Sequence, residues 1–448
     1  MKRQTCFILN FGMGMLLSFN NMAFAGDLPT ETSLHIGLEE TIQRALAASE
    51  ELKIKDREID KKQGDYREER SGLLPHVSAQ STWTRNMSYP EIAASEVADY
   101  QVSRGISASQ VIWSFGKVMY AVDSAKRNVE ASRFKRDASR REIIYTAKLS
   151  YYSALLAKNT LSITEKSYAN VVENKNLLEQ RSYGGRSSTY EILRMNADVA
   201  ARVPTVNESK TQFDAAMETL KKLIDVDQAL EVSLQGDFKE NYDKYVYDAL
   251  VAEMFEREPY LKSLDRAVES ADAEVRSRKS AFLPTVSAFS SWSQTGASNE
   301  SSFPDHADMG DYLWAGVKLD IPIWEGGANE AKLIQSQADR DIAVLRKKQA
   351  QRNYLLDLRK ACLEYEQYKN NLAANTEAVE LAQELFKQAQ EMFSSGQVAL
   401  TDLNDAELLL TNQRLNKEMT LYNINVTLAK IEKLVAGQNE ETIGDEKF

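Results

Sequence analysis

The feature that most constrains this chain is an internal repeat. The stretch SGLLPHVSA, which begins at Ser71, returns as SAFLPTVSA from Ser280, an offset of 209 residues. Trp83 matches Trp292 at the same offset. Further matches follow at an offset of 211: Ile112-Trp113 with Ile323-Trp324, and Gly185 with Gly396. Two constant offsets, separated by a small change in one loop, indicate that a unit of about 210 residues has been duplicated.

The N-terminus carries the pattern of a secretory signal peptide over residues 1–25. Lys2 and Arg3 supply a positive end, an apolar stretch follows over residues 6–17, and small residues end the segment at Ala25. This three-part pattern predicts export of the protein and removal of the segment. An N-terminal membrane anchor is the alternative, but the apolar stretch is too short to span a bilayer.

Composition narrows the class of protein. Removal of Lys2 and Arg3 with the signal peptide takes the formal net charge from −11 to −13, and an acidic chain argues against nucleic acid as a partner. Only Cys362 remains after residue 25, so no internal disulfide can form. No apolar run of transmembrane-helix length follows the signal peptide. A membrane crossing would therefore have to be made by strands in a closed barrel.

Both copies have the same order of elements. We expect a first repeat over 26–235 and a second over 248–436, with a linker at 225–247 and a tail at 437–448. Pro75 and Pro284 should end the first helix of each copy, at the junction with a strand. The expected elements are helix 40–74, strands 76–90 and 99–113, and helices 116–183 and 187–224, then helix 248–282, strands 285–297 and 311–324, and helices 328–395 and 400–436.

The predicted strands alternate with a period of two. Val77, Ala79 and Trp83 fall on one face, and serine, threonine and glutamine residues fall on the other. Apolar residues outside and small polar residues inside are typical of a barrel in lipid around a wet lumen. A half-buried hairpin in a soluble domain would show the same alternation, so the strands alone leave both possibilities open. Four strands cannot close a barrel with a lumen, and a barrel would need other subunits.

Two very long helices favour the barrel. Residues 117–182 and 328–395 contain neither proline nor glycine. Each stretch of about 66 residues would reach roughly 100 Å as a helix. Apolar residues within these helices and the last helix recur at spacings of three and four, which is typical of coiled-coil packing. Pro204 should interrupt the helix after the first turn, either curving a wall inward or marking a tolerated kink.

In this order the elements resemble the TolC-like outer-membrane efflux factor family, over nearly the whole mature length. The resemblance is carried by Leu74-Pro75 and Leu283-Pro284, by the returns at 110–113 and 321–327, and by the turns at 185–191 and 396–402. It implies a mainly α fold with transmembrane β: a homotrimeric twelve-stranded β-barrel, four strands per subunit, continued by a long α-helical coiled-coil barrel. A small mixed equatorial region would include the 225–247 linker.

The resemblance also implies a function and its partners. The chain would be a passive channel in the outer-membrane lipid, with its helical part in the periplasm. It would form the exit duct of a tripartite efflux or type I secretion system. Its partners would be a periplasmic adaptor (membrane fusion) protein and an inner-membrane pump or ABC transporter. The cargo stays open among drugs, metal ions and proteins.

The helix–turn–helix tips hold the candidate functional residues. Gly185 and Gly396 fit the two chain reversals, because glycine takes the left-handed conformation that ends a helix. A spacing of three places Asp402 and Asp405 on one helix face, one turn apart. The resemblance implies that they form a cation ring at the pore constriction. The alternative is the ordinary role of acidic residues in a first helical turn, which complement the helix dipole.

One departure from the family concerns how the tip is held closed. In relatives a tyrosine and an arginine of the second turn bond to the first turn. The aligned positions here are Phe393 and Val398, facing Tyr190 and Glu191, and neither side chain can make those bonds. We predict a different latch, with Arg186 and Glu191 as candidates. Four residues of the turns are also expected to serve in adaptor docking: Gly185, Arg186, Glu191 and Gly396.

Other function classes are disfavoured. His35, His76 and His306 have no metal-ligand spacing to one another or to Cys362, so we expect no metal site. No phosphate-cradling glycine loop is present, and we expect neither a cofactor nor an enzymatic activity. An exported hydrolase is therefore the hypothesis that the sequence supports least. An exported coiled-coil scaffold or adhesion-type structural protein without a pore remains the alternative.

Overall fold

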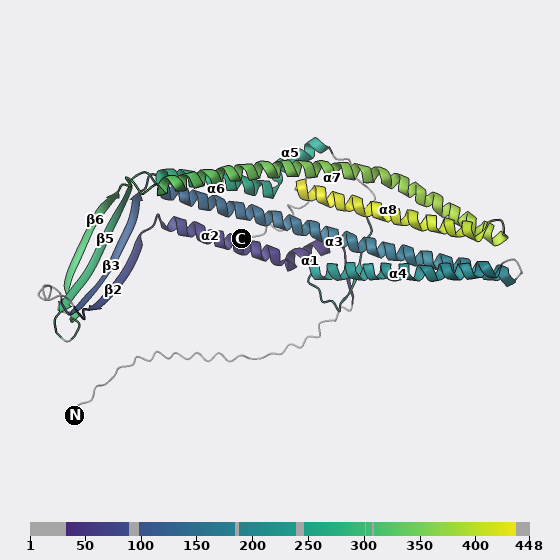
Figure 1. Ribbon diagram of the computed structural model, residues 1–448, viewed down its shortest axis with the longest axis horizontal. Helices are drawn as coiled ribbons and strands as arrows, with labels where there is room; N and C mark the ends of the chain where they lie inside the picture. Colours follow the sequence, from purple (N-terminus) through teal and green to yellow (C-terminus); the bar gives the residue numbers. More distant parts are fainter. Residues whose placement is uncertain are drawn as a thin grey trace, which may run out of the picture.

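The computed structural model describes residues 33–88, 98–183, 188–238, 246–300, 302–306 and 309–435. The predicted signal peptide and the tail at 437–448 lie outside these residues. The described part of the chain is elongated, with a sheet at one end and helices that extend away from it (Figure 1). The sequence enters and leaves the sheet twice, once in each copy of the repeat.

Fourteen elements follow one another in the described residues. In chain order they are β1 Ser33–Ile36, α1 Leu38–Ala48, α2 Glu50–Ser71, β2 His76–Arg85, β3 Tyr100–Trp113, α3 Lys117–Tyr183, α4 Thr189–Leu223, β4 Glu231–Leu234, α5 Tyr247–Arg257, α6 Pro259–Ser280, β5 Thr285–Ser298, β6 Gly310–Asp320, α7 Ala328–Ser395 and α8 Leu400–Val435.

The helices form a wall built on two long members. Helix α3 packs against α2 near the sheet and against α4 farther away, and α7 packs against α6 and then α8 in the same way (Figure 1). The two halves join because α3 also contacts α6 and α8. With 67 residues, α3 spans roughly 100 Å. The wall therefore ends in two helical hairpins, α3–α4 and α7–α8, at the end opposite the sheet.

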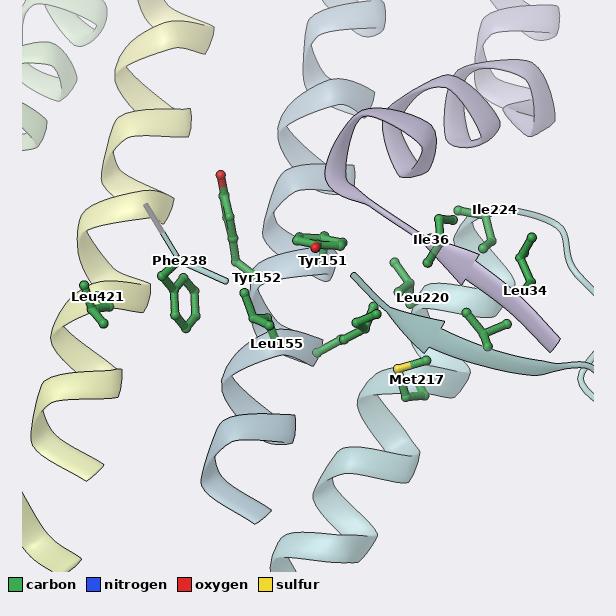
Figure 2. Close-up of a cluster of buried hydrophobic side chains, with 13 residues drawn as sticks. Leu34, Ile36, Tyr151, Tyr152, Leu155, Met217, Leu220, Ile224, Phe238 and Leu421 are labelled. Atoms are coloured by element: carbon green, nitrogen blue, oxygen red, sulfur yellow. The ribbon is translucent and has the colours of Figure 1, made fainter. Parts of the chain in front are cut away.

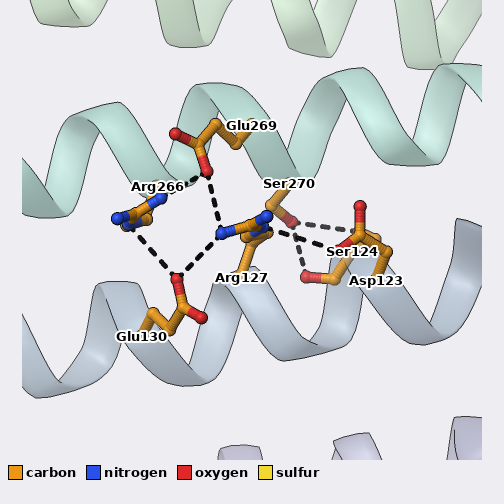
Figure 3. A network of polar contacts seen from close by, with 7 residues as sticks. All are labelled: Asp123, Ser124, Arg127, Glu130, Arg266, Glu269 and Ser270. Atoms are coloured by element: carbon orange, nitrogen blue, oxygen red, sulfur yellow. Dashed lines mark hydrogen bonds and ion pairs between the residues drawn. The ribbon is translucent and has the colours of Figure 1, made fainter.

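Polar contacts fix the register between α3 and α6. The Ser124 and Ser270 hydroxyls are buried and lie 3.0 Å apart. Beside them Arg127 forms ion pairs with Glu269 of α6 and with carboxylates of its own helix (Figure 3). Arg266 of α6 completes the network by reaching Glu130 of α3. These partly exposed pairs add little stability individually, but a shared network holds the two helices in one alignment.

The four-stranded sheet is antiparallel, with the strand order β2-β3-β5-β6. Strands β3 and β5 join the two copies of the repeat, and Ile106 pairs with Trp292 at the centre. Strands β2 and β6 are the edges of this sheet. An edge strand presents a row of unpaired backbone donors and acceptors, which makes it a template for pairing with another chain.

A second, small sheet lies beside the middle of the helical wall. Strand β1 pairs in parallel with β4, so the start of the described chain meets the segment between the two copies. Ile36 and Leu234 from these strands lie in one buried apolar cluster with Leu155 of α3 and Leu220 of α4 (Figure 2). The predicted 225–247 linker thus contains a strand and part of a core.

Two helices predicted as continuous are broken. The predicted helix 40–74 is divided at Ser49, which leaves helical geometry and accepts a bond from the Leu52 backbone N–H at 3.3 Å. The predicted helix 248–282 is divided at Glu258, because Pro259 occupies the first position of α6. Proline lacks the N–H that a continuous helix would need there.

Other predicted bounds differ less. The four long helices lie within two residues of their predictions, and α4 runs through Pro204 as one helix. A bend of the wall at Pro204 stays a prediction. Strand β6 ends at Asp320 rather than at 324, because Pro322 follows and cannot donate to a sheet. Strand β2 ends at Arg85, and the predicted strand residues 89 and 90 lie outside the described part.

Candidate functional site

One face of the sheet is an exposed apolar band. Along β6 and beyond, large apolar side chains of this face are exposed, with Leu313 76 %, Val317 72 % and Ile323 93 % accessible. At about 3.4 Å per residue and a strand tilt near 40°, the ten residue steps from Leu313 to Ile323 span about 25 Å along a barrel axis. That height is typical of the lipid-facing band of a transmembrane barrel.

The opposite face of the sheet is polar. The register places serine, threonine and glutamine residues there on neighbouring strands, and the hydroxyls of Ser78 and Ser107 are 2.8 Å apart. The sheet therefore has one face suited to hydrocarbon and one suited to water. This division follows from the period-two pattern of the sequence.

The junctions between helix and strand are alike in both copies. At Pro75 and Pro284 the preceding helix ends in a tight turn, in which the Leu74 and Leu283 backbone N–H groups bond to carbonyls three residues earlier. The proline then starts an extended chain. Both predicted junction residues thus lie where α2 and α6 pass into β2 and β5.

The turn of the second hairpin has the predicted glycine. Gly396 has a φ of 86°, and its N–H bonds to the Phe393 carbonyl, while the Gln397 N–H bonds to the Met392 carbonyl. This is the left-handed reversal that glycine makes without strain. Gly185 and Arg186 of the first turn lie outside the described residues.

An arginine that the sequence reasoning missed joins the two hairpins at this end. Arg181, in the last turn of α3, donates to the Phe393 carbonyl of α7 at 2.9 Å. Its guanidinium also lies over the Phe393 ring, 4.5 Å from the ring centroid. Phe393 is almost fully buried, in a cluster that Val398 also contacts. The side chain that cannot hydrogen-bond is thus held through its ring and its backbone.

Glu191, one of the predicted latch residues, has a local partner. Its carboxylate accepts from the Ser188 backbone N–H at 2.8 Å, and Ser188 in turn accepts from the Glu191 N–H. This reciprocal pair is the capping box that starts α4. A latch role for Glu191 stays a prediction, whereas Arg181 makes a contact between the hairpins in this structure.

Asp402 and Asp405 are both exposed on α8, one turn apart. The Asp402 carboxylate accepts from the Ala399 backbone N–H at 3.2 Å, which is the ordinary role of an acidic residue at a helix start. Asn404 between them points elsewhere and donates to Asp198 of α4 at 2.7 Å. The geometry therefore accommodates both roles considered for Asp402.

A buried ion pair, also missed from the sequence, links the hairpins farther from the turn. Glu407 of α8 is fully buried and accepts from Arg202 of α4 at 2.8 Å. Thr411 donates to the second carboxylate oxygen at 2.9 Å, and Arg202 also reaches Ser167 of α3 at 3.0 Å. Three helices thus meet at one charge pair. Charged residues of long exposed helices give no sequence signal that would single out this pair.

Two further observations concern the described residues only. They contain no group of three or more histidine, cysteine, aspartate or glutamate side chains that could hold a metal ion. None of the helices in the ranges given above is both long and apolar enough to cross a membrane.

Comparison with known proteins identifies the family. The family model described as outer membrane efflux protein matches residues 41–225 and 250–437, one range on each copy of the repeat. The chain belongs to the outer membrane efflux protein family. The family locates the protein in the outer membrane and gives it the role of an efflux channel.

Individual relatives have low sequence identity to this chain but match it over most of its length. The toluene efflux pump outer membrane protein TtgC of Pseudomonas putida is 21 % identical over 374 residues, covering 80 % of this chain and 74 % of that protein. The cation efflux system protein CusC of Escherichia coli is 20 % identical over 400 residues, covering 86 % and 82 %.

Solved structures show the same fold. The CmeC outer membrane channel of Campylobacter jejuni matches with a TM-score of 0.79 at 16 % identity, covering 89 % of this chain and 85 % of that one. The outer membrane protein VceC of Vibrio cholerae matches with a TM-score of 0.78 at 16 % identity, covering 89 % and 96 %. The predicted fold class, mainly helical with a four-stranded transmembrane sheet, is confirmed by these likenesses.

Proposed function

We propose that three copies of this chain form a passive exit duct, which docks a periplasmic adaptor and an inner-membrane pump of a tripartite efflux or type I secretion system. The observation that carries this proposal is the open sheet. It has an apolar face, a polar face and two unpaired edges, β2 and β6. A single four-stranded sheet of this kind would expose its edges in lipid, where unsatisfied backbone groups are costly. Pairing β2 of one copy with β6 of the next removes every edge.

The helical wall supports the same closure. Its outer members are α7 on one side and α2 with α4 on the other. Both borders carry exposed apolar side chains, among them Ile54 of α2 and Leu345 and Leu363 of α7, which are 57 %, 63 % and 55 % accessible. Such residues at a helix border suit packing against another helix. A second copy would bury both borders and continue the wall around a tunnel.

The hairpin ends would form the tunnel entrance. In a trimer, Asp402 and Asp405 would contribute six carboxylates around the axis, a ring that favours cations. Two contacts would hold the α7–α8 hairpin against the α3–α4 hairpin, in the role predicted for a latch. They are the contact of Arg181 with Phe393 and the Arg202–Glu407 ion pair. Opening the entrance would require these contacts to shift or separate.

The outer side of the same end suits adaptor binding. Tyr190 and Leu193, in the first turns of α4, are 70 % and 64 % accessible. Exposed apolar residues at helical spacing are typical of grooves that receive a partner helix. We assign adaptor docking to this region together with the turn residues Gly185, Arg186, Glu191 and Gly396. The duct itself needs no energy source, because the pump supplies it.

The proposal is tested by the assembly and conductance of the mature protein. Purified in detergent, it should migrate as a trimer that dissociates on heating, and it should conduct ions in a planar lipid bilayer. A coiled-coil scaffold without a pore would give neither result. A monomeric protein that stays soluble without detergent would contradict the proposal.

A further inference from the structure

The polar face of the sheet has one aromatic interruption. Phe289 of β5 and Tyr312 and Trp314 of β6 lie together on this face, and we name these three residues the aromatic platform. The register fixes their placement, because Trp314 is paired with Ser291 and Tyr312 with Ser293. Paired residues of neighbouring strands point to the same side of a sheet. The platform therefore shares its face with serines, threonines and glutamines.

The platform has a defined geometry. The Phe289 and Trp314 rings meet edge to face, with centroids 5.6 Å apart and planes at 70°. Gly316 lies opposite Phe289, and a Cβ at this position would be 2.8 Å from Phe289 Cζ. The absence of a side chain at Gly316 thus lets the Phe289 ring lie across β6. Trp314 is supported on one side by Phe289 and keeps 58 % of its surface exposed, and Tyr312 keeps 60 %.

No helix of the described residues covers the platform. The helices that the structure describes extend away from the end of the sheet (Figure 1). The tryptophans that suit a lipid interface, Trp83 and Trp292, belong to the opposite face, where Trp292 pairs with Leu313. Exposing an aromatic cluster on a face that is otherwise polar costs hydrophobic free energy, and such patches commonly mark binding sites.

We propose that the aromatic platform is a stacking site for planar aromatic molecules that leave through the channel. The inference rests on the proposed function, because only a closed barrel turns this face into the wall of a water-filled lumen. Three copies would place three platforms at one height. A planar ring system would stack on the free face of Trp314, with hydroxyl groups such as Ser291 and Ser293 beside it. Stacking on one exposed ring is weak enough to permit release, as conduction requires.

Ethidium, a planar aromatic cation, serves as the probe. Its fluorescence polarisation is followed as mature trimer in detergent is added, with empty micelles as the blank. We expect saturable binding that Trp314→Ala weakens by roughly five- to a hundred-fold, the factor lost with one stacking partner. Trp314→Leu keeps a large apolar side chain but removes the aromatic ring, so it should weaken ethidium binding by a similar factor. Trp292→Ala is the matched control, because it removes the same residue type from the lipid-facing side and should leave binding unchanged.

Each remaining outcome decides the inference. Equal loss in Trp314→Ala and Trp292→Ala would show uptake by the lipid-facing surface and would overturn it. Displacement of ethidium by equimolar tetrapropylammonium, a cation without rings, would show recognition of charge rather than of the aromatic plane, with the same consequence. A trimer that conducts ions but binds no ethidium would refute the platform and leave the channel intact. A monomer without conductance would refute both.

Discussion

The buried Arg202–Glu407 pair gives the sharpest prediction about how the tip is held. Replacing Arg202 by methionine keeps the length of the side chain but removes its charge. Glu407 is fully buried, so its carboxylate would be left without the partner that now donates at 2.8 Å. Breaking a buried pair in this way costs about 3–5 kcal/mol, because the remaining charge is neither paired nor hydrated.

The cost should appear as local opening of α8. At 1.4 kcal/mol for each factor of ten, it corresponds to a rise of roughly a hundred- to a few thousand-fold in the opening of the first turns of α8. Amide hydrogen exchange of residues 400–411 in the assembled protein measures this directly. The matched control is Lys347→Met, which removes an ion pair to Asp265 whose side chains are 36 % and 47 % exposed. An exposed pair is worth only about 0–1 kcal/mol, so exchange should barely change.

A double variant distinguishes the lost pair from a general disturbance. Arg202→Met with Glu407→Leu removes both charges and should recover most of the lost protection, because an apolar pair can replace a buried ion pair. A stabilising role of the Arg202–Glu407 pair would be refuted if Arg202→Met changed the exchange of residues 400–411 no more than Lys347→Met does. It would also be refuted if the double variant opened as readily as the single one.

Three further predictions concern pH, the turn and the entrance. Burial raises the pKa of Glu258 from 4.5 to about 7, so the folded protein binds a proton at this carboxyl more readily than the unfolded chain does. The contribution of Glu258 to the free energy of unfolding is therefore fully present below pH 4.5 and is lost as the pH rises through 7. Glu258→Gln, which keeps an acceptor for the Tyr260 N–H, should therefore raise the thermal midpoint at pH 8 more than at pH 5, by a contribution of about 3 kcal/mol at most, and an equal shift at both pH values would contradict this. Gly396→Ala forces a Cβ onto a residue with φ of 86° and should cost about 1–2 kcal/mol in the second hairpin, measured by exchange at its turn, with no effect on exchange counting against the assigned geometry. Neutralising Asp402 and Asp405 to asparagine should lower the cation preference in reversal-potential measurements, and an unchanged preference would leave these residues only their helix-start role.

Much of the fold could be predicted from the sequence, because the signals that set it are local. Pro75 and Pro284 each follow the end of a helix and start an extended chain, and period-two alternation fixes the two faces of each strand. The long helices follow from stretches without proline or glycine. The repeat then relates the two halves without any knowledge of their contacts.

The missed features depend on which residues meet in space. The break at Ser49 lies in a stretch with good helix formers on both sides, so only the side-chain cap that accepts from Leu52 marks it. Arg181 is one of many basic residues on α3, and nothing in its neighbours along the chain indicates that it reaches Phe393. The same holds for Glu407, whose burial depends on three helices coming together.

In the proposed trimer the sheet of one chain is completed by two others. Native mass spectrometry of the mature protein, released from detergent in the spectrometer, measures the number of chains directly. We expect one dominant species of three chains, which dissociates only when the sheet edges separate. A single chain, stable in aqueous buffer with both edge strands unpaired, would contradict it.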